Sequence, residues 1–229
     1  MFLVLLDQSA AFDTVHQDLL LHKLCCRYGI TGSALTLLSS YFKGRTQSVM
    51  IDGTSSEPKE LKTGFPQGSV LGPYMYPLYT SELFEIAQKH GINIHMYADD
   101  TQLYVACDPA HRHETLKMLE TAISEIRQWM IANHLKLNDS KTEFMVMRKP
   151  SLRKNIEDTT RICIGDTAVH AANHAQNIGT TLDTEITMTG HINNTSKSCY
   201  SQIRQISHIR ARGEKTTKLF FRQETNSPM

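Results

Sequence analysis

The stretch from Ile94 to Val105 constrains the fold most, because it holds two adjacent carboxylates between two short runs rich in β-branched and aromatic residues. Each run predicts a strand, and Asp99 with Asp100 predicts the tight turn that joins them. A hairpin of this kind presents both carboxylates at one end of a sheet. Asp also suits turns for purely conformational reasons. However, two like charges ~4 Å apart repel by about 4 kcal/mol at an effective dielectric near 20, and a bound cation would relieve that repulsion.

A third carboxylate follows the first apolar run of the chain. Residues 2–6 are continuously apolar, which predicts a buried central strand, and Asp7 stands at its C-terminal tip. Central strands are normally preceded by other elements, so we expect the N-terminus to lie within a domain. If Asp7 meets Asp99 and Asp100 at one end of the sheet, the crowding of negative charge would favour a bound cation.

The rest of the chain alternates helical and strand patterns. Asp52-Gly53 is a turn signal between the strand-like runs 46–51 and 59–63, and it predicts a hairpin. Further short strands are expected at 141–147, 161–164 and 175–182, with a polar loop at 150–160. Apolar periodicity predicts helices over about 18–28, 33–42 with Ser33 as the N-cap, 70–89, 114–133 and 192–210.

Three further features have more than one interpretation. Residues 64–73 hold three glycines and two prolines directly before a predicted helix. Such a segment either exposes backbone N–H groups to a ligand or only caps the helix, and glycine spacing does not separate the two. Lys141 is the one basic residue placed where the strand ends gather, although a lone lysine is usually solvated. Cys107, His111 and His113 could suggest zinc, but no second ligand pair follows, so we expect an ordinary loop and helix start.

The composition is that of a globular protein without a strong overall charge. The 24 basic and 23 acidic side chains leave a net charge of +1, so a nucleic acid would have to be held by local patches. Five cysteines without CxxC spacing favour a reducing compartment over a disulfide framework. The sequence shows neither a signal peptide nor an apolar run of membrane-spanning length, so we expect an intracellular protein without membrane contact. Nothing in the sequence indicates the oligomeric state.

The segments discussed above carry a family resemblance. They resemble three successive motifs of reverse transcriptases, particularly those of non-LTR, LINE-type retrotransposons: LLDQSAAFDTV at 5–15, GFPQGSVLGP at 64–73 and YADDT at 97–101. NHLKLN at 133–138 with KTE at 141–143 is similar to the fourth motif, and IGTTLD at 178–183 to the start of the fifth. The similarity spans about residues 2–210. Ordered motifs at suitable intervals are far more specific than any single one.

The resemblance implies an α+β fold, the right-hand polymerase palm, in which helices back an antiparallel sheet, with a partial connection or thumb region. It implies RNA-directed DNA synthesis, with an RNA template, a DNA primer and a dNTP as partners. Two Mg²⁺ ions, for which Mn²⁺ can substitute, would be bound by Asp7 and Asp99 with Asp100 beside them. Lys141 would protonate the leaving group, and Phe12 would exclude a ribose 2′-hydroxyl. The implied substrate-binding set also contains Gln67, Gly68 and Tyr97.

The chain departs from the family pattern in several places. Gln8 stands where an apolar residue is usual after the first Asp, and His16 where an acidic residue is common. We expect residues 1–150 to be the palm core, 151–210 its end and the start of a thumb-like region, and 211–229 a divergent or disordered tail. The resemblance implies a fingers region before the first strand, and we expect that region to be missing from this chain. We therefore expect a fragment that extends a primer poorly by itself, from a nuclear or cytoplasmic parent element. The alternative is a catalytically inactive retroelement remnant with at most weak nucleic-acid binding.

Overall fold

Four antiparallel strands form the central sheet of the computed structural model, in the order β6-β7-β1-β8. The structure describes residues 1–66, 68–148, 160–165 and 167–224, with side chains through residue 208. The four strands are β1 (Phe2–Leu6), β6 (Asn93–Tyr97), β7 (Asp100–Val105) and β8 (Glu143–Val146). This arrangement confirms the predicted hairpin and the predicted central position of the first strand.

Strand β1 is buried on both faces, which explains its unbroken apolar sequence. Phe2, Val4 and Leu6 belong to the main core. The alternate residues, Leu3 and Leu5, pack in a second cluster with Met145, Met147 and Ala175 on the opposite face of the sheet. Full burial of such a side chain contributes roughly 1.5–3 kcal/mol, so packing on both faces stabilises the position of β1.

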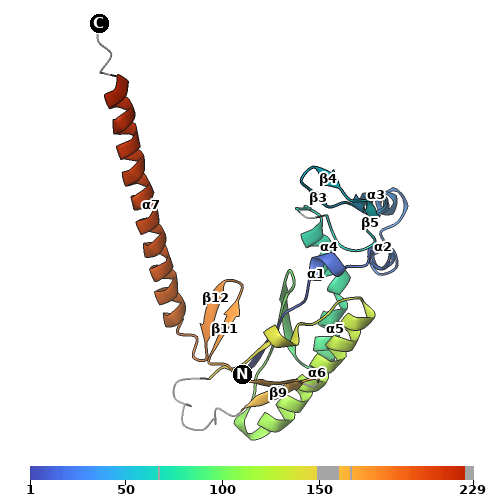
Figure 1. Cartoon of the computed structure of the whole chain (residues 1–229). Coiled ribbons are helices and arrows are strands. Elements are labelled where there is room, and N and C mark those ends of the chain that lie inside the picture. Colours follow the sequence, from blue (N-terminus) through green and yellow to red (C-terminus); the bar gives the residue numbers. More distant parts are fainter. Residues whose placement is uncertain (67, 149–159, 166, 225–229) are drawn as a thin grey trace.

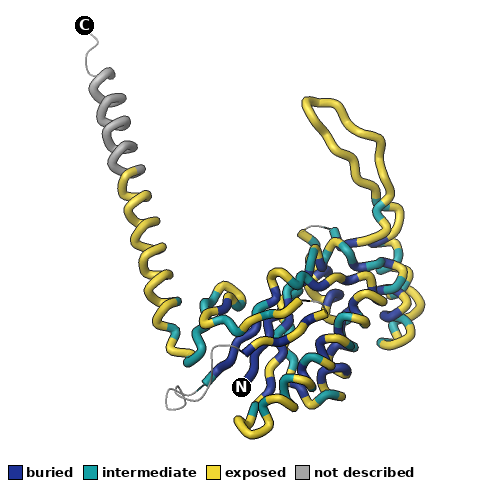
Figure 2. Tube along the Cα trace, turned by 60° about the horizontal axis from the view of Figure 1, so that its bottom comes forward, coloured by how far each residue is buried: buried dark blue, intermediate teal, exposed yellow. Residues whose placement is uncertain are grey.

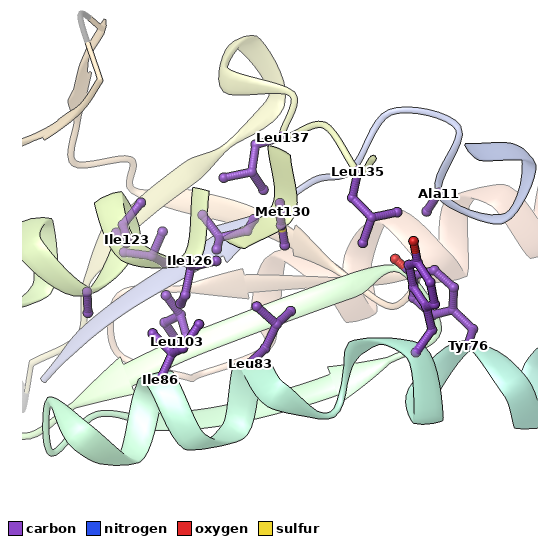
Figure 3. Packing of buried hydrophobic residues seen from close by; sticks show 14 of the residues in the cluster. Ala11, Tyr76, Leu83, Ile86, Leu103, Ile123, Ile126, Met130, Leu135 and Leu137 are labelled. Carbon is purple, nitrogen blue, oxygen red and sulfur yellow. The ribbon is translucent and has the colours of Figure 1, made fainter. Parts of the chain in front are cut away.

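The main core lies between the sheet and a layer of helices (Figure 3). Leu83 and Ile86 of α5 (Glu82–Lys89) face Leu103 of β7 in this core. The apolar stripe predicted for residues 114–133 is confirmed, since Leu119, Ile123, Ile126 and Met130 of α6 (Arg112–Ala132) are buried in the same cluster. The other helices of this part of the chain are α1 (Ala11–Thr14), α2 (Gln17–Cys26), α3 (Gly32–Phe42) and α4 (Gly72–Thr80).

Two predicted helix boundaries in the first ninety residues were wrong. The single helix expected over 70–89 is divided into α4 and α5 at Ser81. The Tyr28 hydroxyl donates to the Leu78 carbonyl, and Phe84 N donates to the Ser81 carbonyl only three residues back, so a tertiary contact competes with the regular helical bonding. Helix α3 begins at Gly32 after Thr31, so Ser33 is not its N-cap.

The glycine turn at Asp52-Gly53 closes a hairpin that stands out from the body of the protein (Figure 2). Its strands are shorter than predicted and all eight of their residues are exposed: β2 (Thr46–Gln47), β3 (Met50–Ile51), β4 (Thr54–Ser55) and β5 (Lys59–Glu60). Two further hairpins confirm the strands expected late in the chain: β9 (Arg161–Ile164) with β10 (Thr167–His170), and β11 (His174–Asn177) with β12 (Thr180–Asp183). Most of the loop predicted at 150–160 lies outside the described residues.

The last helix, α7 (Thr189–Glu224), projects away from the sheet (Figures 1 and 2). It begins before the predicted start at Ile192 and continues beyond the predicted end near Arg210, through Glu224. Residues 214–224 contain no Gly or Pro, and nothing in this stretch forces the helix to stop. Among the described residues, no helix is both long enough and apolar enough to cross a membrane. The proposed division at 150 and 210 remains a prediction.

Candidate active site

The β6–β7 hairpin carries Asp99 and Asp100, but its turn lies one residue earlier than predicted. Ala98 and Asp99 form the turn, and Asp100 is the first residue of β7, paired with Tyr97. Ala98 adopts a left-handed conformation with φ 55°. The register is set by the core, because alternate residues of β7, beginning at Thr101 and including Leu103, are buried. Asp100 therefore points to the exposed face of the strand.

Asp7 reaches the same end of the sheet from the neighbouring strand. Leu6 pairs with Thr101 in an antiparallel register, so the residue after Leu6, Asp7, lies beside Asp100. Burial raises the pKa of the Asp100 carboxyl above its usual value, and the charges of Asp99 and then Asp7 add to this effect. The structure therefore brings the three predicted carboxylates to one end of the sheet.

The donor chemistry of this end of the sheet fits a hard divalent cation. All three side chains offer carboxylate oxygens, and after partial burial of Asp100 the charges of Asp99 and Asp7 are the next causes that raise its pKa. Within the described part of the chain, no three His, Cys, Asp or Glu side chains are arranged so that they alone could hold a metal ion. Mg²⁺ does not need such a cage, because it usually keeps several waters and takes one or two carboxylates plus substrate phosphates. Asp7, Asp99 and Asp100 are the residues that could hold it.

Lys141 lies at the edge of this group. Its ammonium nitrogen is 4.0 Å from an Asp7 carboxylate oxygen, and its side chain is largely exposed. Two backbone hydrogen bonds hold residues 136–138 against the residues that follow β1. Asn138 N donates to Asp7 O at 2.9 Å, and Ser9 N donates to Lys136 O at 2.9 Å. The exposed position leaves Lys141 free to reach a ligand bound beside Asp7.

Phe12 lies on the short helix α1, which directly follows the first carboxylate segment. Its ring stacks on Tyr76 with a centroid distance of 4.8 Å, and it meets Phe65 edge-on at 6.0 Å. Gly64 holds the glycine-rich segment against this helix: it has φ +80°, and a Cβ there would come within 3.0 Å of the Asp13 carbonyl oxygen. Phe12 as a whole is half-buried.

The structure gives less information on the other predicted substrate-binding residues, Gln67, Gly68 and Tyr97. Gln67 lies outside the described residues. Gly68 is exposed with φ +75°, and Tyr97 is exposed at the end of β6. The Ser69 hydroxyl accepts hydrogen bonds from Leu71 N at 3.1 Å and Gly72 N at 3.0 Å. Two N–H groups at the start of α4 are thus already capped, which supports the capping interpretation for this part of the segment.

Sequence reasoning did not assign a role to two buried polar residues next to the carboxylates. Gln8 is buried directly after Asp7, and its side chain bonds the turn of the β6–β7 hairpin and the Tyr76 hydroxyl. Burial strongly raises the pKa of Tyr76, with a further contribution from the charge of Asp99, so Tyr76 remains a hydrogen-bond donor. The available signal was the presence of a polar residue at position 8, where similar motifs have an apolar one.

The expectation for Cys107, His111 and His113 agrees with the structure. Cys107 donates to the Asp108 carbonyl, and Asp108 caps the 3₁₀ turn Pro109–His111 by accepting from Ala110 N. This is a loop and a helix start.

A helix-backed antiparallel sheet with three carboxylates at one end is the arrangement expected of a polymerase palm. Comparison with protein families agrees: residues 1–207 match the family described as reverse transcriptase (RNA-dependent DNA polymerase). The chain belongs to this family.

Its relatives are retrotransposon polymerases. The chain is 27% identical over 213 residues to the probable RNA-directed DNA polymerase from transposon BS of Drosophila melanogaster, with 89% of this chain and 22% of that protein covered. It is 26% identical over 211 residues to the RNA-directed DNA polymerase from mobile element jockey of Drosophila funebris, with 90% and 22% covered. These matches support a LINE-type reverse transcriptase domain, and the chain spans about a fifth of the length of these relatives.

Solved structures show the same fold at low sequence identity. Apo telomerase from Candida tropicalis, truncated from its C-terminal domain, aligns with a TM-score of 0.54 and 15% identity, covering 82% of this chain and 34% of that one. Telomerase from the same organism, in complex with a fragment of telomeric RNA, aligns with a TM-score of 0.54 and 13% identity, covering 82% and 29%. The predicted palm-type α+β fold is thereby confirmed.

Proposed function

We propose that this chain supplies the catalytic palm of an RNA-directed DNA polymerase that adds dNTPs to a DNA primer on an RNA template. The observation that carries the proposal is the convergence of Asp7, Asp99 and Asp100 at one end of the central sheet. Family membership and the names of the Drosophila relatives support the reaction class.

Each residue of the site has a separate role in the proposed reaction. When bound, two divalent cations supply activation of the primer 3′-hydroxyl and stabilisation of the leaving pyrophosphate. Asp7 and Asp99, with Asp100 beside them, hold the cations with hard oxygen ligands. Lys141, 4.0 Å from Asp7, donates a proton to the leaving pyrophosphate. Phe12 lies under the sugar and excludes a 2′-hydroxyl by steric contact.

The cation site is tested by thermal melting of this chain with and without millimolar Mn²⁺. A ligand that binds only the folded state stabilises it by mass action, by ~2.7 kcal/mol at one hundred times its dissociation constant. We expect the wild-type chain to melt at a higher temperature with Mn²⁺ and the Asp99→Asn variant to show little change. An equal shift in both proteins would remove Asp99 from the site.

The reaction is tested by primer extension on poly(rA) with an oligo(dT) primer. The wild-type chain and its Asp99→Asn variant are each placed in the jockey polymerase of Drosophila funebris, in exchange for the matching segment. We expect dTMP incorporation by the wild-type exchange alone, with the intact relative as positive control. A folded wild-type exchange that binds the template–primer but is as inactive as its Asp99→Asn partner would favour the catalytically inactive remnant.

A further inference from the structure

The Gln8 side chain connects three separate elements beneath the carboxylates. Only 5% of the residue is exposed. Its amide nitrogen donates to the Asp99 carbonyl at 3.1 Å and to the Thr101 hydroxyl at 3.3 Å, and its amide oxygen accepts from the Tyr76 hydroxyl. Because a backbone carbonyl can only accept a hydrogen bond, the amide nitrogen must face Asp99, and this orients the whole group.

These bonds join the two segments that carry the carboxylates. Gln8 directly follows Asp7, and its own backbone pairs with Leu137, so its position at the end of β1 is held from the other side. Asp99 lies in a two-residue turn, where Ala98 has a left-handed backbone. The bond from Gln8 ties the carbonyl of this turn to the strand end that carries Asp7.

Tyr76 links Gln8 to Phe12, the aromatic residue that is expected to lie under the sugar. Tyr76 is fully buried on α4, where Figure 3 shows it beside Ala11 at one end of the core. Its ring stacks on Phe12 at 4.8 Å with an interplanar angle of 29°. One side chain therefore packs against Phe12 through its ring and bonds Gln8 through its hydroxyl.

We propose that Gln8 and Tyr76 are positioning residues that hold the Asp99 turn at its working distance from Asp7 and back the ring of Phe12. This inference rests on the proposed function, because it assigns the pair a role toward the cation site and the sugar. An apolar residue at position 8 would leave the Asp99 turn without its side-chain restraint. Outer-shell partners of this kind typically change metal affinity by about 10–100-fold when they are removed.

Two measurements on this chain test the proposal without any polymerase assay. Mn²⁺ binding is titrated by the electron paramagnetic resonance signal of the free ion, and amide hydrogen exchange of residues 93–105 is followed without metal. Gln8→Leu removes all three hydrogen bonds at similar volume. Tyr76→Phe removes one hydroxyl and keeps the ring against Phe12. Thr80→Val is the matched control, since Thr80 is a fully buried residue of the same helix whose hydroxyl donates to Tyr76 O at 2.9 Å, away from the turn.

We expect Gln8→Leu to bind Mn²⁺ about 10-fold more weakly. It should also exchange the amides of the β6–β7 hairpin several-fold faster. Tyr76→Phe should change both properties in the same direction by a smaller factor, and Thr80→Val should change neither. If Gln8→Leu does not fold, the removal of the single Tyr76 hydroxyl decides the question in the same way.

The Asp99→Asn variant separates failure of this inference from failure of the proposed function. If Asp99→Asn weakens Mn²⁺ binding and Gln8→Leu and Tyr76→Phe do not, the positioning role is wrong and the cation site stands. If Asp99→Asn binds Mn²⁺ as well as the wild type, the proposed cation site fails and the inference fails with it. Equal effects of Thr80→Val and Gln8→Leu would show general loosening of the core and would also overturn the inference.

Discussion

A buried ion pair between Lys23 and Glu82 joins the helices that back the site, and its removal leads to a quantitative prediction. The Lys23 ammonium on α2 lies 3.1 Å from a Glu82 carboxylate oxygen on α5 and donates to Tyr79 O at 3.2 Å. It also lies 4.6 Å from the ring centroid of Trp129 on α6, whose indole nitrogen donates to Glu82. Burial lowers the pKa of Lys23 despite the opposing effects of Glu82. This ammonium therefore depends on its counter-charge.

The geometry gives the size of the effect. Two unit charges 3.1 Å apart attract by about 5 kcal/mol at an effective dielectric near 20. Loss of one partner of a buried pair usually costs about 3–5 kcal/mol. The Glu82 side chain is 29% exposed and glutamine keeps the hydrogen bond, so we expect Glu82→Gln to lower the free energy of unfolding by about 2 kcal/mol. For a chain of this size, that is a decrease of roughly 4–8 °C in melting temperature.

The double variant Lys23→Met, Glu82→Gln distinguishes this explanation from simple loss of packing. It removes the stranded charge, so it should be more stable than Glu82→Gln alone, within about 1 kcal/mol of the wild type. Urea unfolding is followed by the fluorescence of the single tryptophan, Trp129, and by circular dichroism. Asp18→Asn, which breaks the exposed pair with Lys43, is the control and should leave the unfolding midpoint unchanged. A double variant as unstable as the sum of its single changes would refute the reasoning.

Three other predictions concern single side chains. In primer extension, Phe12→Ala should reduce discrimination against ribonucleotides more than it reduces use of deoxynucleotides, because it removes a clash; unchanged discrimination would mean a packing role only. Burial and neighbouring charges raise the pKa of Asp100, so its stabilising contribution is present below pH 3.8 and lost as the pH rises through the raised pKa. Asp100→Asn should therefore melt higher than the wild type at neutral pH in chelator, and a lower melting temperature would contradict this. Hydrogen bonds led by that from Thr187 N lower the pKa of Asp183, so its contribution is present above pH 3.8 and lost as the pH falls through the lowered pKa. Wild type and Asp183→Asn should differ in melting temperature near neutral pH and converge in acid, and a constant difference would argue against this role.

Local patterns in the sequence were sufficient for the main elements of the palm. The apolar run before Asp7 predicted a strand buried on both faces, and β1 packs its alternate residues into two separate clusters. The apolar stripe of α6 was equally clear, because a period of 3.6 residues is a property of the segment itself. The carboxylates were found for the same reason: each stands at the end of a strand whose pattern is local. Their roles as metal ligands remain predictions.

Boundaries that depend on distant contacts were placed less accurately. The turn lies at Ala98 and Asp99 because burial of alternate residues in β7 sets the strand register. The helix expected over 70–89 divides near Ser81, where the Tyr28 hydroxyl bonds the Leu78 carbonyl from 50 residues away. The sequence of each segment shows neither the core packing that sets the β7 register nor the hydrogen bond from Tyr28 to Leu78.

The sequence by itself determined the family, the order of the main strands and helices along the chain, and which carboxylates stand at strand ends. Motifs and periodicity are properties of short segments, so they can be recognised without the tertiary structure. Only the tertiary structure decided how these ends are held together. Gln8 bonds the Asp99 carbonyl 91 residues later and the Tyr76 hydroxyl 68 residues later. In the sequence, Gln8 is only a polar residue at a position where an apolar one is usual. Its side chain acquires buried hydrogen-bond partners only when β1, α4 and the β6–β7 turn pack against one another.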